Sequence, residues 1–309
     1  MKLGAALKKA VADGTLTEEE AIAKWKEAVG RYGEGHGKGK LKAPVELRVR
    51  GVVREYRLHV PAAKPEGKMP LLVAFHGAGG RDDPFPQQAR FHELAEAEGF
   101  IIAYPMSKAV PGNEGEWQLN TSARQRQDID FIEALIDDVS ARHPVDPKRV
   151  YATGYSLGSM FTYELACHLN SRFAAIASFA GTMPVSPNAF TQEDPVAIMH
   201  IHGFKDRIIA YGGEWDWKEW DSVGTMRNIP GLVEYWSRKY NCTKKTETKS
   251  ASAIHVVHEG GNGAVRVEHY RLNRVGHEWP ETINGVSTHR VIWSFLKGFS
   301  KPQDTRSGH

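Results

Sequence analysis

The motif GYSLG at residues 154–158 stands between a stretch that predicts a strand and one that predicts a helix. Residues 149–153 are apolar and β-branched enough for a short buried strand, and the apolar residues of 159–169 fall at helical spacing. In that context G-x-S-x-G predicts a nucleophile elbow, a tight turn that lifts Ser156 above a sheet and directs the next backbone N–H toward a substrate. Because so short a motif recurs by chance, the interpretation also depends on partners downstream.

The rest of the chain alternates between predicted strands and helices. Strands are expected at residues 46–53, 55–60, 70–75, 100–104, 150–153, 173–179, 196–202, 254–258 and 265–272. Helices are expected at residues 87–98, 124–142, 159–169, 231–240 and 287–299. The basic run Lys244–Lys249 is interpreted as a solvated loop. This alternation predicts an α/β fold, with a doubly wound, mostly parallel sheet and helices on both faces.

Four segments are expected along the chain. Residues 1–29 predict an N-terminal helical hairpin, in which Thr17 and Glu20 form a capping box. Residues 30–44 are a Gly/Lys-rich linker, residues 45–300 the catalytic domain, and residues 301–309 a disordered tail. The hairpin has too little surface to fold alone, so it docks on the main domain or pairs with another chain.

Charge and hydropathy exclude several classes of protein. The 309 residues include 40 Lys and Arg against 37 Asp and Glu, a balance that gives no nucleic-acid footprint. No apolar run reaches the roughly 18 residues of a membrane-spanning helix, so no membrane partner is expected. Lys8 and Lys9 interrupt the N-terminal apolar residues, which predicts no signal peptide in this sequence. A cleaved signal would leave the same pattern.

The two cysteines, Cys167 and Cys242, allow either one disulfide or two buried thiols, and the sequence leaves both open. No second metal-ligand pair accompanies them, so no metal site is expected.

A serine hydroxyl needs a base and an orienting acid to become a nucleophile. With G-x-S-x-G elbows the order along the chain is Ser, acid, His. Asp206 follows the end of the strand at 196–202, and parallel strands carry such ends to one edge of the sheet. Asp194 precedes that strand and is expected at the far edge. Asp216 and Asp221 are later alternatives for the acid.

His277 is the expected base, because it lies between the last predicted strand and the last predicted helix, at the same edge. The other histidines after the elbow fall inside or beside predicted elements. The predicted catalytic residues are therefore Ser156, Asp206 and His277.

An oxyanion hole needs two backbone N–H groups aimed at the developing negative charge. One is expected from Leu157, directly after the nucleophile. The other is expected from Ala78, in the glycine-rich loop at residues 76–80. His76 ends the preceding strand, where a structural hydrogen bond is expected rather than a catalytic one.

Tryptophans cluster after the predicted acid. Trp215, Trp217 and Trp220 are close together in a charged stretch without a strand pattern, and they predict an exposed aromatic loop over the site. Trp117 and Trp279 are candidates to join it as substrate-binding residues. Aromatic faces suit sugar rings, a feruloyl ring or an apolar polyester, and the alternative is that these tryptophans cover core surface.

Five short stretches carry a resemblance to a known family. They are residues 75–79 (FHGAG), 154–160 (GYSLGSM), 173–177 (FAAIA), 202–206 (HGFKD) and 276–280 (GHEWP). They resemble the secreted α/β-hydrolase esterases of the polyhydroxybutyrate depolymerase and feruloyl/acetylxylan esterase group, across about residues 45–300. The resemblance implies an α/β-hydrolase fold, a triad at Ser156, Asp206 and His277, and hydrolysis of carboxylic esters through an acyl-enzyme without a cofactor. It also implies an extracellular or periplasmic location.

This sequence departs from that family beside the acid, where Phe204, Lys205 and Arg207 replace a small residue and Pro, and where the following stretch is longer. The favoured function is a serine esterase of the feruloyl/acetylxylan type on plant polysaccharide esters. The alternatives are a polyhydroxyalkanoate depolymerase and, from another class, a catalytically inactive hydrolase-fold protein that binds carbohydrate. The expected partner is an ester substrate on a polysaccharide or a polyester, and the oligomeric state is left open.

Overall fold

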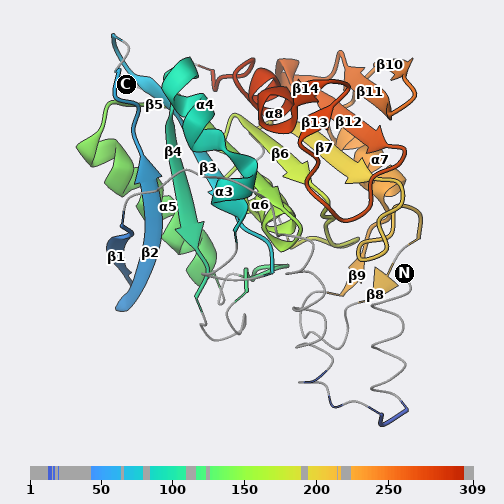
Figure 1. Ribbon diagram of the computed structural model, residues 1–309, viewed down its shortest axis with the longest axis horizontal. Coiled ribbons are helices and arrows are strands. Elements are labelled where there is room, and N and C mark those ends of the chain that lie inside the picture. Colours follow the sequence, from blue (N-terminus) through green and yellow to red (C-terminus); the bar gives the residue numbers. More distant parts are fainter. Residues whose placement is uncertain are drawn as a thin grey trace, which may run out of the picture.

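A sheet of ten strands crosses the molecule, in the order β1-β2-β4-β3-β5-β6-β7-β12-β11-β10 (Figure 1). The computed structural model describes residues 13–15, 17, 20, 43–63, 66–78, 84–108, 116–122, 126–188, 194–213, 215–216 and 224–302. The strands of the sheet are β1 (Val45–Val49), β2 (Val52–His59), β3 (Met69–Phe75), β4 (Ile101–Met106), β5 (Val145–Tyr155), β6 (Ala175–Phe179), β7 (Ala197–Gly203), β10 (Lys244–Lys249), β11 (Ala253–Glu259) and β12 (Val267–Leu272). Two short ribbons are β8 (Trp215–Asp216) with β9 (Thr225–Met226), and β13 (Thr282–Ile283) with β14 (Val286–Ser287).

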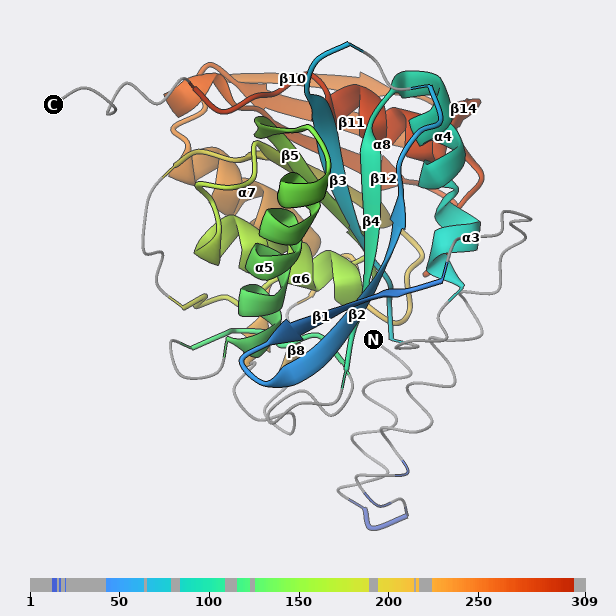
Figure 2. The same ribbon diagram turned by 90° about the vertical axis from the view of Figure 1, so that its left-hand side faces the viewer.

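Helices cover both faces of this sheet. They are α3 (Phe85–Ala89), α4 (Phe91–Glu98), α5 (Gln127–Arg142), α6 (Leu157–His168), α7 (Ile229–Lys239) and α8 (Thr288–Leu296). Figure 2 shows α5, α6 and α7 on one side of the strands and α3, α4 and α8 on the other. The middle strands pair in parallel, and β3, β4, β6 and β7 are buried along their whole length. Their unbroken apolar runs are what a strand covered on both faces requires. The predicted α/β fold, a mostly parallel sheet with helices on both faces, is confirmed.

The first predicted strand was too long, because a hairpin turn interrupts it. Arg50 and Gly51 both have positive φ, of 46° and 84°, and they connect β1 to β2 in antiparallel register. Two residues with positive φ are the hairpin connection that matches the twist of the flanking strands.

The predicted helix at residues 87–98 is two helices. Arg90 adopts a left-handed conformation with φ of 55°, which ends α3 and begins α4. Phe85 and Phe91, at the starts of the two helices, are both fully buried. The break therefore lets both short helices present an aromatic side chain to the core.

The interpretation of Lys244–Lys249 as a loop is wrong, since these residues form β10 at the edge of the sheet. Their backbone pairs with β11 from Lys244 opposite Glu259 to Lys249 opposite Ile254, while every side chain is exposed. A strand with solvent on both sides shows no apolar alternation that a sequence pattern could detect. Lysines on an edge strand also disfavour pairing with another chain.

The N-terminal prediction is tested only at its capping box. The Thr17 N–H donates to the Glu20 carboxylate at 2.8 Å, and the Glu20 N–H donates to the Thr17 hydroxyl at 3.2 Å, as a capping box requires. The remainder of the expected hairpin, most of the linker and residues 303–309 lie outside the described residues. Cys167 and Cys242 are free thiols. Within the described ranges, no helix is both long and apolar enough to cross a membrane.

Candidate active site

Ser156 occupies the turn between β5 and α6 with a strained backbone, φ 53° and ψ −120°. Its N–H donates to the Phe179 carbonyl at 2.9 Å, which ties the turn to the neighbouring strand. A Cβ at Gly158 would lie 2.3 Å from the His76 carbonyl oxygen, and one at Gly154 would lie 2.4 Å from Gly158. Both glycines are therefore required by close backbone approach, and the turn has the geometry expected of a nucleophile elbow.

The structure brings Ser156, His277 and Asp206 into one hydrogen-bonded line. His277 Nε2 lies 2.8 Å from Ser156 Oγ, and His277 Nδ1 lies 2.7 Å from Asp206 Oδ2. All three residues are buried. Because an ionised carboxylate only accepts, Nδ1 carries the ring proton of the neutral histidine, and Nε2 can accept the proton of the serine.

Asp206 is held as a carboxylate by several donors. Its Oδ1 accepts the backbone N–H groups of Ile208 and Ile209, each at 2.8 Å. Burial would raise the pKa of Asp206, but the charge of His277 and hydrogen bonds from His202 and His277 outweigh it and hold this pKa well below its usual range. The acid therefore stays ionised while it orients the base.

The acid loop after β7 and the base loop after β12 are joined through their backbones. Gly203 permits this contact, since a Cβ there would lie 2.2 Å from the Gly276 carbonyl oxygen. The Lys205 N–H donates to the Val275 carbonyl at 3.0 Å. These main-chain contacts hold the two loops together, and so they fix the positions of the acid and the base relative to each other.

Tyr155, within the elbow motif, also holds the base loop, which the sequence reading missed. Its hydroxyl donates to the His277 carbonyl at 2.6 Å, across 122 residues of chain. The residue is almost fully buried beside the nucleophile. Its only sequence signal was a polar aromatic residue at the variable position of the motif.

The loop expected to supply an oxyanion donor lies beside the elbow, against Gly158. His76 Nε2 accepts the Ser107 N–H at 3.0 Å, so the proton of the neutral ring is on Nδ1, which donates to the Gly77 carbonyl at 2.7 Å. In a trans peptide the C=O and N–H point in opposite directions, so the Ala78 N–H faces away from the His76 ring. His76 has the structural role expected of it.

Leu157 begins α6, where the first N–H groups of a helix have no partner within the helix. The roles of Leu157 and Ala78 as oxyanion donors stay predictions.

The structure places two of the tryptophans in the core rather than on an open surface. Trp117 is 2% exposed, and its Nε1–H donates to the His76 carbonyl at 3.0 Å. Trp279 is 8% exposed and packs against Phe85 and Phe179. Their rings are therefore not part of an exposed aromatic surface, because they pack among buried aromatic side chains. Their roles as substrate-binding residues stay predictions. Trp215 lies in β8, and Trp217 and Trp220 lie outside the described residues.

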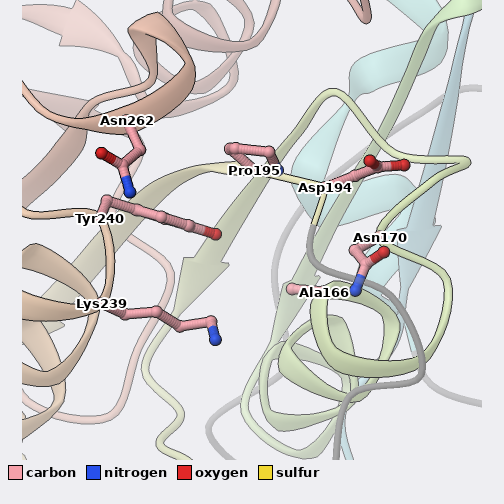
Figure 3. A pocket seen from close by; sticks show the side chains of 7 residues that line it. All are labelled: Ala166, Asn170, Asp194, Pro195, Lys239, Tyr240 and Asn262. Atoms are coloured by element: carbon pink, nitrogen blue, oxygen red, sulfur yellow. The ribbon is translucent and has the colours of Figure 1, made fainter.

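Of the alternative acids, Asp194 lies away from the triad. Asp194 lines a small cavity at the opposite end of β7, with Lys239 and Tyr240 from the end of α7 (Figure 3). This is the far edge of the sheet, as predicted. Asp216 belongs to β8, and Asp221 lies outside the described residues. In the part of the chain that the structure describes, no three metal-ligating side chains gather into a possible metal site.

Comparison with known proteins gives related sequences and folds. Residues 54–207 match the family model described as esterase PHB depolymerase. The chain is 28% identical over 210 residues to a bifunctional acetylxylan esterase/xylanase of Neocallimastix patriciarum, an alignment that covers 66% of this chain and 26% of that protein. It is 23% identical over 236 residues to feruloyl esterase B of Piromyces equi, covering 75% of this chain and 42% of that protein. The chain thus spans less than half the length of either relative.

A solved structure of an acetyl xylan esterase from Aspergillus awamori shares the fold. Its TM-score is 0.56 at 16% identity, and the match covers 79% of this chain and 96% of that one. At this identity the similarity shows the architecture only. Taken together, the family match, the related sequences and the fold show that this chain is similar to the α/β-hydrolase esterases of the polyhydroxybutyrate depolymerase, feruloyl esterase and acetylxylan esterase group.

Proposed function

We propose that this protein hydrolyses carboxylic esters through an acyl-enzyme formed on Ser156. The observation that carries the proposal is the position of His277, whose two ring nitrogens contact Ser156 Oγ and Asp206 Oδ2 at 2.8 and 2.7 Å. In the first step Ser156 attacks the ester carbonyl while His277 Nε2 takes its proton. His277 then gives that proton to the leaving alcohol, and Asp206 stabilises the imidazolium between the two events. A water molecule repeats the sequence on the acyl-enzyme and releases the acid.

The negative charge of the tetrahedral intermediate would be held by the N–H groups of Leu157 and Ala78. Since His76 orients the peptide that carries the Ala78 N–H, replacing His76 with alanine should weaken this donor. We expect kcat to fall about ten- to a hundredfold with little change in KM, because the donor acts on the transition state. Steady-state kinetics on a soluble ester checks this, and a purely raised KM would contradict it.

The substrate class that we favour is a feruloyl or acetyl ester on a plant polysaccharide. The two curated relatives, an acetylxylan esterase/xylanase and a feruloyl esterase, support it by name. The family model, which is described by its depolymerase members, supports a polyhydroxyalkanoate as the alternative substrate. A location outside the cytoplasm goes with either polymer and stays a prediction.

The test is product release from methyl ferulate, acetylated xylan and a polyhydroxybutyrate film, with the Ser156→Ala variant as the blank. We expect ferulate or acetate to be released by the wild-type protein and not by the variant. Release of hydroxybutyrate alone would favour the depolymerase. Equal release by both proteins would refute catalysis by Ser156. A folded wild-type protein that is silent on all three but binds xylan would support the inactive carbohydrate-binding alternative.

A further inference from the structure

Three buried histidines that the proposed mechanism does not use lie beneath the acid loop. His200 and His202 project from the same face of β7, and His269 stands opposite His200 on β12. The ring of His200 lies 5.3 Å from that of His202 and 5.6 Å from that of His269. His200 and His202 are completely buried. Buried polar rings need hydrogen-bond partners, and the partners of these three histidines determine which ring nitrogens donate and which accept.

The partner atoms determine which nitrogen of each ring carries the proton. His202 Nε2 lies 2.8 Å from the Ile209 carbonyl oxygen and 3.3 Å from Asp206 Oδ2. Both oxygens only accept, so the proton is on Nε2, and Nδ1 of a neutral His202 must accept. His200 Nε2 donates to it at 3.2 Å. That leaves His200 Nδ1 as an acceptor, and the Tyr163 hydroxyl donates to it at 2.7 Å.

The row is therefore a chain of donors that runs in one direction, from Tyr163 through His200 to His202, whose Nε2–H donates to the Ile209 carbonyl and lies 3.3 Å from Asp206 Oδ2. Its last N–H reaches the same carboxylate oxygen that accepts the proton of His277. The two N–H groups that bond to Asp206 Oδ1 belong to the turn that follows it. His202 is a side chain of β7 that faces the other carboxylate oxygen, Oδ2.

The surroundings keep His200 and His269 uncharged. Burial, with smaller contributions from His202 and His269, lowers the pKa of His200 well below its ordinary value. Burial likewise lowers the pKa of His269 to about 3, and this ring donates to the His200 carbonyl and faces the Tyr211 hydroxyl. A neutral His200 has a single N–H, and the hydrogen bond that its Nδ1 accepts from Tyr163 leaves that N–H on Nε2, facing His202.

We propose that Tyr163, His200 and His202 are positioning residues for Asp206: the chain holds His202 in the tautomer whose Nε2–H secures the carboxylate opposite His277. The inference rests on the proposed function. In the absence of the Tyr163 hydroxyl, His200 can move its proton to Nδ1 and then accept from His202. His202 Nε2 would then carry a lone pair that faces the Ile209 carbonyl oxygen and Asp206 Oδ2. The carboxylate would lose the N–H donor from His202.

The first test uses Tyr163→Phe, which removes the hydroxyl that bonds to His200. With 4-nitrophenyl acetate as substrate we expect kcat to fall about three- to tenfold at unchanged KM, the size of one lost buried hydrogen bond. The matched control is Tyr151→Phe, because Tyr151 is equally buried but its hydroxyl donates to the Phe299 carbonyl, away from the site. The control should keep the wild-type kcat. Equal values for both variants would overturn the inference.

The second test uses His202. We expect His202→Phe to lower kcat about ten- to a hundredfold, and His202→Gln to restore most of the loss, because the Gln amide can place a donor where Nε2 stood. The double variant with Tyr163→Phe should lose no more than His202→Phe alone, since both changes break one chain. Failure of Gln to rescue, or fully additive losses, would mean that the ring only fills space. Should His202→Phe fail to fold, the Tyr163 comparison still decides.

Ser156→Ala, assayed beside these variants, separates the two hypotheses. Turnover that survives in Ser156→Ala would refute the proposed function. An inactive Ser156→Ala together with full kcat in Tyr163→Phe and His202→Phe would refute the positioning chain alone.

Discussion

Replacement of His277 with alanine is expected to lower kcat by about a millionfold, while KM for a soluble ester changes little. The size follows from the geometry, because His277 is the side chain that contacts both Ser156 Oγ and the acid. Without it the serine keeps its proton at neutral pH. Stopped-time product assays on concentrated enzyme would measure the residual rate.

Asp206→Asn is the matched variant for the same line of residues. It keeps the shape of the acid but reverses the preference for the ring proton on Nδ1, and kcat should fall about ten-thousandfold. His289→Ala, in α8, removes a histidine outside the line and should leave kcat unchanged. A His277→Ala variant that keeps more than about a thousandth of the wild-type kcat would place the base elsewhere.

Gly158→Ala is expected to cost several kcal/mol of unfolding free energy, or to prevent folding. Alanine normally stabilises a helix relative to glycine by about 1 kcal/mol, so the usual expectation at this position in α6 is the opposite sign. Here the added Cβ would lie 2.3 Å from the His76 carbonyl oxygen and 2.5 Å from that of Phe75. Backbone atoms of a buried strand end cannot move aside as a flexible side chain can. Chemical denaturation of the purified variant measures the loss.

Gly212→Ala provides the control for that measurement. Gly212 is exposed, and a Cβ there would meet nothing within 4 Å. The substitution should be neutral or stabilise the protein by less than about 1 kcal/mol, because it restricts the unfolded chain. Comparable stability of both variants would show that α6 can shift away from the backbone of Phe75 and His76, which would contradict the close approach at Gly158.

Local sequence patterns predicted the strand–turn–helix around Ser156 and the buried strands, because each depends on residues near one another in the chain. The acid and base could be chosen from their places after strands, since a parallel sheet gathers those strand ends at one edge. The boundaries that failed depend on single residues in unusual conformations, such as Arg90, which splits one predicted helix into α3 and α4. Side-chain identity gives little warning of such a φ at an arginine.

Features that depend on distant pairing could not be predicted. The alignment of His200 with His269 follows from the register between β7 and β12, and that register is set by the whole sheet. The Tyr155 contact to the base loop joins segments 122 residues apart. Trp117 was a candidate to join an aromatic loop over the site, whereas its ring stacks on Phe161 from α6 at a centroid separation of 5.0 Å.

The backbone contact between the acid loop and the base loop bears on how this protein can be recombined with its relatives. A chimera whose crossover falls between residues 207 and 274 takes Gly203 from one parent and Gly276 from the other. In such hybrids the backbones of the two loops come from different parents, and they must still approach so closely that no Cβ fits at residue 203. Crossovers before residue 197 or after residue 283 would transfer both loops together. Inherited as one block, the acid and base can be moved onto new substrate loops without separate adjustment.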